Sequence, residues 1–128
     1  MQYYISKTVH AKFQETINKV TDLLKEEGFG ILTQIDVRDT LKKKLDIDYK
    51  RYVILGACNP HLAIRAFQAE DKIGALLPCN VIVIDQGHGN IEVAIMDAKN
   101  LMSQIGNPAL EVLALEVNNR MTRMLNKV

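Results

Sequence analysis

The sequence has no tryptophan, two cysteines, three prolines and only 5% aromatic residues. Its 16 basic and 15 acidic residues leave a net charge of +1, so no general field attracts it to nucleic acid or anionic lipid. No apolar run reaches the roughly 20 residues of a membrane span, and Met1–Lys7 lacks the basic start and apolar core of a signal peptide. We therefore predict a cytoplasmic protein that binds neither nucleic acid nor membranes and keeps its cysteines reduced unless they have a chemical role.

The remaining composition is that of one globular domain. Hydrophobic residues make up 48% and charged residues 24%, close to the averages of soluble proteins. A chain of 128 residues can bury a core without disulfides or structural metals. Because there is no internal repeat and no low-complexity linker, we predict a single domain over residues 1–128.

Apolar spacing and turn residues predict the order strand, helix, strand, helix, strand, helix, strand, strand, helix. The predicted strands are Tyr3–Thr8, Phe29–Ile35, Tyr52–Cys58, Cys79–Asp85 and Ile91–Met96. The predicted helices begin near Phe13 and after the capping residues Asp36, Asn59, Asp97 and Asn107. The short helix after Asp97 and the last helix after Asn107 share the final helical place in this order. A tight turn over residues 86–90 joins the last two strands into an antiparallel hairpin. The alternation before it is typical of a parallel sheet, so the pattern alone permits both α/β and α+β folds.

Two similar tetrads, Ala57–Pro60 and Leu77–Asn80, contain both cysteines and two of the three prolines. Cys58 ends one predicted strand and Cys79 begins another, and binding sites are commonly built at strand ends. If these two strands are antiparallel neighbours, the end of one meets the start of the other. The thiols then lie near each other.

Three kinds of site fit this pattern. The first is a pocket for an unknown small ligand, or an interaction site, formed by Cys58, Asn59, Cys79 and Asn80. The second is a thiol redox or thiol-transfer enzyme, with Cys58 activated at a helix start and Cys79 as the resolving thiol. The third is a zinc site made by Cys58, His61 and Cys79. No cofactor is predicted, no substrate is indicated, and whether the protein is an enzyme stays open.

Each feature also has a plainer interpretation. Free cysteines are usually small buried hydrophobes, and an Asn before Pro is explained by helix capping. Asn80 has no such explanation. The basic residues Lys42–Lys44, with Arg38, Lys50 and Arg51 nearby, either attract a phosphate or acidic partner or form a solvated surface balanced by aspartates.

Four phrases of the sequence, in this order, resemble the domain-of-unknown-function family 302: Glu27–Thr33, Ile35–Val37, Tyr52–Pro60 and Gly74–Val81. The resemblance implies a small α+β domain with a mostly antiparallel sheet of about five strands and helices packed on it. It also implies a homodimer, and it assigns no activity.

The family pattern at the third strand centres on Gly56, Asn59 and Pro60. Many members lack one or both cysteines, and position 61 is commonly not histidine. Chemistry that depends on Cys58, Cys79 or His61 would therefore be particular to this branch of the family.

Overall fold

The computed structural model describes residues 2–128, so Met1 of the predicted domain lies outside the described residues. It contains one five-stranded sheet with the order β1-β5-β4-β3-β2, in which every neighbouring pair is antiparallel. The strands are β1 (Tyr4–His10), β2 (Gly30–Asp36), β3 (Tyr52–Cys58), β4 (Cys79–Asp85) and β5 (Asn90–Met96). The α+β prediction and the β4–β5 hairpin are confirmed, and the parallel α/β alternative is wrong.

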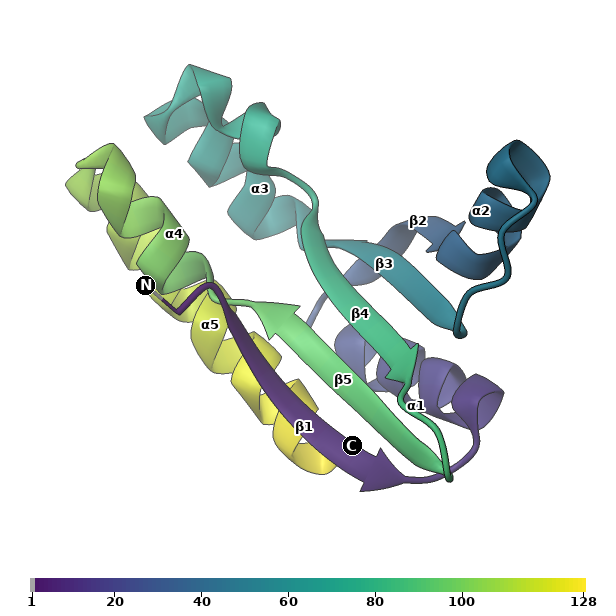
Figure 1. Cartoon of the computed structure of the whole chain (residues 1–128). Helices are drawn as coiled ribbons and strands as arrows, with labels where there is room; N and C mark the ends of the chain where they lie inside the picture. The colour runs from purple at the N-terminus through teal and green to yellow at the C-terminus, as the bar shows by residue number, and fades with distance from the viewer. Residues whose placement is uncertain (1) are drawn as a thin grey trace.

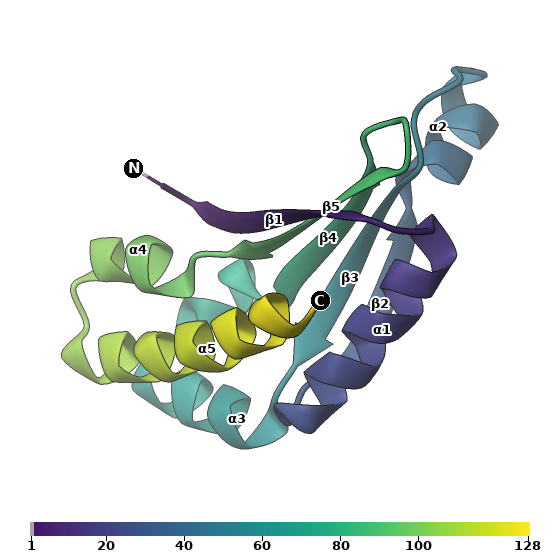
Figure 2. The same cartoon turned by 90° about the horizontal axis from the view of Figure 1, so that it is seen from below.

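The long helices α1 (Phe13–Glu26) and α5 (Pro108–Lys127) lie against one face of this sheet, as Figures 1 and 2 show. At one end of the sheet lie α3 (Pro60–Ala69), the 3-10 helix η1 (Asp71–Leu76), α4 (Ala98–Met102) and the 3-10 helix η2 (Ser103–Ile105). The short helix α2 (Val37–Leu45) lies at the other end. Among residues 2–128, no helix combines the length and apolar character that crossing a bilayer requires.

The main core lies between the sheet and its two long helices. The predicted stripe of α1 is buried, with Phe13, Ile17, Val20 and Leu24 at 6% exposure or less. Alternate residues of the three central strands meet this stripe, because successive side chains of a strand point to opposite faces. Each fully buried aliphatic side chain contributes roughly 1.5 to 3 kcal/mol, so this layer holds the sheet and helices together.

A second, smaller core cluster lies beyond the start of β4. Its members are Ile73, Ala98, Met102, Leu110 and Ala114. Residues 71–76, for which no helix is predicted, form η1 and bury Ile73 in this cluster. Leu77, Met96 and Val117 pack against both clusters and connect them.

All four predicted helix caps are present. The side chains of Asp36, Asn59, Asp97 and Asn107 accept hydrogen bonds from backbone N–H groups in the first turns of α2, α3, α4 and α5. Such caps typically contribute about 1 kcal/mol each. The cap of α3 also fixes where β3 ends and the chain turns, which positions the candidate site.

Candidate ligand-binding site

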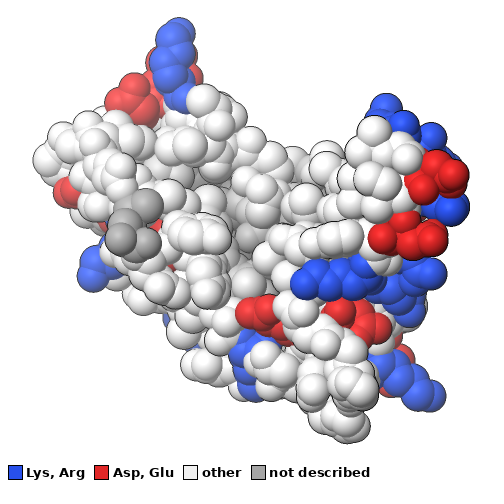
Figure 3. Space-filling view, in the orientation of Figure 1, with Lys and Arg blue, Asp and Glu red and all other residues white. Residues whose placement is uncertain are grey.

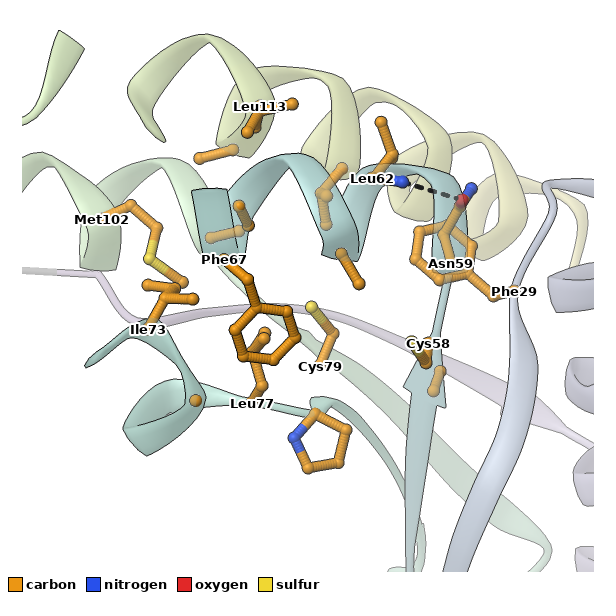
Figure 4. Close-up of a pocket in the computed structure, with 18 of the residues that line it drawn as sticks. Phe29, Cys58, Asn59, Leu62, Phe67, Ile73, Leu77, Cys79, Met102 and Leu113 are labelled. Carbon is orange, nitrogen blue, oxygen red and sulfur yellow. Dashed lines mark hydrogen bonds between the residues drawn. The ribbon is translucent and has the colours of Figure 1, made fainter. Parts of the chain in front are cut away.

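A cavity of about 310 Å³ lies between α3, η1, α4, α5 and the facing ends of β3 and β4 (Figure 4). We call it the apolar pocket. Its wall consists of Phe29, Leu32, Ala57, Cys58, Asn59, Leu62, Ala63, Ala66, Phe67, Ile73, Gly74, Leu77, Pro78, Cys79, Ala98, Met102, Leu110, Leu113, Ala114 and Val117. Among residues 2–128, no Lys, Arg, His, Asp or Glu side chain lines it.

The pocket occupies the seam between the two core clusters. Phe29, Ala57 and Cys79 belong to the main cluster, whereas Ile73 and Met102 belong to the smaller one. Small residues on the facing elements leave the space unfilled. They are Ala63, Ala66, Gly74, Ala98 and Ala114.

Three of the four predicted ligand-binding residues lie in the wall of this pocket: Cys58, Asn59 and Cys79. Ala57 of β3 is opposite Cys79 of β4, so the antiparallel register brings the two cysteines to adjoining positions. Both thiols are free; Cys79 is buried and Cys58 is half-buried. The antiparallel pairing of the two cysteine-bearing strands, which the sequence analysis assumed, is therefore present.

The fourth residue, Asn80, does not line the pocket. It is exposed and lies opposite Gly56 of β3. Because neighbouring residues of a strand point to opposite faces, the burial of Cys79 turns Asn80 away to the uncovered face of the sheet. Asn80 is therefore separated from the other three residues, which lie in the pocket wall.

His61 is also outside the pocket, since it is exposed on the first turn of α3. No group of three or more His, Cys, Asp and Glu side chains that could hold a metal ion occurs in the part of the chain that is described, residues 2–128. Cys58, His61 and Cys79 therefore do not assemble into a zinc site.

The Asn59 side chain has a structural role. It is 6% exposed, and its Oδ1 accepts a hydrogen bond of 3.3 Å from the backbone N–H of Leu62. Its Nδ2 packs against Gly28, where an added Cβ would lie only 2.8 Å from it. Gly28 has a φ of +87°, so both backbone conformation and space favour glycine there.

Gly56 on β3 is packed closely between β2 and Pro78, the residue that precedes β4. A Cβ at this position would collide with Thr33 Oγ1 on β2 and lie 2.8 Å from Pro78 Cγ. The three residues on which the family pattern centres, Gly56, Asn59 and Pro60, are thus explained by packing and helix initiation.

The Cys79 thiol is held in its neutral form. Burial raises its pKa from 9.0 to about 11, and the neighbouring Cys58 adds to this effect. At pH 7 roughly one thiol in ten thousand is then ionised, and only the thiolate is a good nucleophile. The geometry disfavours Cys79 as an attacking thiol.

Two exposed large side chains of the pocket wall, Leu32 and Phe67, were not among the predicted site residues. Leu32 is 67% exposed and sits where the β2–β3 register shifts between Ile31 and Thr33. Phe67 is 45% exposed, and its ring lies 3.5 Å from where a Cβ of Gly74 would be. The available signal was the run of small residues in α3, Ala63 and Ala66, beside a large aromatic.

Fold and site together define a small α+β protein with an open antiparallel sheet and an apolar pocket at one end. The sequence profile described as domain of unknown function DUF302 matches residues 5–128. The chain belongs to this family.

One similar solved structure is an uncharacterized conserved DUF302 protein from Bacillus stearothermophilus, with a TM-score of 0.90 and 30% sequence identity. The match covers 98% of both chains. No curated protein matches the sequence.

Proposed function

We propose that this protein binds a small apolar molecule in the apolar pocket, with Cys58, Asn59 and Cys79 in the wall. The supporting observation is the unfilled seam between two core clusters. Protein interiors are normally packed with few voids larger than a water molecule, whereas ligand sites commonly measure about 300 to 1,000 Å³. A cavity of about 310 Å³ at the ends of two strands falls within the range of ligand sites.

Filling the pocket tests this proposal. Ala114 on α5 is 4% exposed and lines the pocket, so Ala114→Leu places a larger side chain in the cavity. The matched control is Ala109→Leu, the same change at an exposed position of the same helix.

The measurement is the thermal shift caused by a panel of apolar molecules, together with native mass spectrometry of the purified protein. We expect binding by the wild type and by Ala109→Leu, and none by folded Ala114→Leu. If all three proteins bind equally or none binds, the proposal is wrong.

A thiol redox or thiol-transfer enzyme is the second candidate, because the pocket wall contains two free thiols. The high pKa of Cys79 weighs against it, and so does the absence of carboxylate, imidazole and amine groups from the part of the wall that residues 2–128 form. Alkylation of the folded protein at pH 7 discriminates between the two. Rapid labelling of both cysteines supports the enzyme, and labelling only after denaturation eliminates it.

We also propose that two copies associate through the uncovered face of the sheet. Large apolar side chains are exposed at Leu32 (67%), Ile35 (47%) and Tyr4 (37%). Figure 3 shows that the middle of this face is hollowed and uncharged, which favours an apolar contact over a charged partner. The cytoplasmic location stays a prediction.

Light scattering tests the association. We expect a dimer for the wild type and a monomer for Ile35→Asp, because the new carboxylate cannot be desolvated without a partner. Val112→Asp on the outside of α5, where the side chain is 66% exposed, is the control and stays dimeric. A wild type that is monomeric at high concentration contradicts the proposal.

A further inference from the structure

We propose that the molecule bound in the apolar pocket is neutral and planar, with about two fused aromatic rings. This inference rests on the proposed function and specifies its ligand class. Three properties of the pocket support it: volume, absence of charge, and the polarisable groups in its wall.

The volume sets the size of the ligand. A cavity of about 150 Å³ lined by aliphatic and aromatic side chains holds one benzene molecule. The apolar pocket, at about 310 Å³, is close to twice that volume. A two-ring molecule therefore fills it, whereas one ring leaves half of it empty.

The lining sets the charge of the ligand. Residues 2–128 supply no ionisable side chain to the wall other than the two thiols. Asn59 is the one residue between 2 and 128 that contributes a side-chain amide to the wall. Its carbonyl oxygen caps α3, and Figure 4 shows it turned toward the Leu62 nitrogen. A carboxylate or phosphate inside the pocket would be desolvated without a partner, which is strongly unfavourable.

The wall also favours rings over chains. Three sulfur atoms line the pocket, from Cys58, Cys79 and Met102, and so do the rings of Phe29 and Phe67. Sulfur and aromatic groups both make favourable contacts with an aromatic ring beyond simple burial. A linear hydrocarbon of equal size gains burial alone and loses rotational freedom when it binds.

Three probes with similar carbon content separate these claims. Naphthol is neutral and has two rings, naphthoate adds a negative charge to the same rings, and decanol is neutral but linear. We expect naphthol to bind about tenfold more tightly than either of the others, measured by calorimetry near pH 7. Met102→Leu should weaken naphthol binding severalfold and affect decanol binding by a smaller factor, because only the aromatic probe gains from the sulfur.

The outcomes distinguish this inference from the function on which it rests. If decanol binds as tightly as naphthol and Ala114→Leu abolishes both, the pocket binds apolar ligands but the aromatic class is wrong. Equal binding of naphthoate overturns the requirement for neutrality. If no probe binds, both the ligand class and the proposed function fail.

Discussion

The two ends of the sheet both carry hollows, but their linings differ in kind. Near α2, two hollows of about 260 and 410 Å³ are lined largely by charged and polar side chains, with Arg38 and Arg51 common to both. Near α3, the apolar pocket of about 310 Å³ has no charged residue in its described wall. The hollow of about 410 Å³ near α2 is larger than the apolar pocket, so volume alone does not identify a ligand site.

The charges near α2 are largely balanced within the same segment. Lys42 pairs with Asp46 at 3.0 Å and with Asp48 at 3.3 Å, and Lys43 pairs with Asp39 at 2.9 Å. All of these side chains are more than half exposed. This arrangement supports the solvated-surface interpretation of Lys42–Lys44. The comparison teaches that the unusual hollow is the one whose described wall carries no charge.

The largest effect is expected from a substitution that disrupts the packing at the pocket end of the sheet. Gly56→Val places side-chain atoms against Thr33 and Pro78, so we expect a loss of about 3 kcal/mol or more in the free energy of unfolding. Gly30→Val is the control, since nothing lies within 4 Å of its added Cβ. We expect a change of less than about 1 kcal/mol there, measured by urea denaturation. Equal losses in the two variants contradict the packing argument.

Alkaline titration tests the burial of Cys79. Its pKa is raised from 9.0 to about 11 in the folded protein, so the unfolded chain loses this proton first as the pH rises. The neutral thiol therefore contributes stability below pH 9, and this contribution is lost as the pH rises to 11. We expect the free energy of unfolding to fall by about 2 to 3 kcal/mol more in the wild type than in Cys79→Val. Parallel pH curves for the two proteins would show that the thiol is not buried as described.

Two helix caps provide a smaller, directly matched test of the two ends. Asn59→Ala removes a buried cap at the pocket end, and we expect a loss of about 1 to 2 kcal/mol in the free energy of unfolding. Asp36→Ala removes an exposed cap of α2, for which we expect about 0.5 kcal/mol. Thermal denaturation of both variants checks the order, and a larger loss for Asp36→Ala contradicts it.

Local features of the fold could be predicted from the sequence. Each cap requires only a side chain and the next few backbone nitrogens, and all four were placed correctly. The adjoining positions of Cys58 and Cys79 followed from one assumption about strand pairing, which the β3–β4 register satisfies. The antiparallel character of the sheet followed from the family resemblance, because periodicity alone left both α/β and α+β folds open.

The composition of the site could not be predicted in the same way. Met102, Leu110 and Leu113 lie in the same wall as Cys79, and their position there depends on how α4 and α5 pack. Asn80 was assigned to the pocket because the alternation of side chains along a strand does not show which face of the sheet the helices cover. Polar residues drew attention to the strand ends, whereas the pocket is distinguished by small residues on several facing elements. Only the pair Ala63 and Ala66 beside Phe67 in α3 gave a local signal in the sequence.

The most direct test of the central claim is a titration of the labelled protein with naphthol, followed by backbone and methyl nuclear magnetic resonance. We predict chemical-shift changes centred on Cys79, Met102 and Leu113, with none at Arg38 or Arg51. Changes centred on the two arginines, or no change at Cys79 and Met102, would contradict the account.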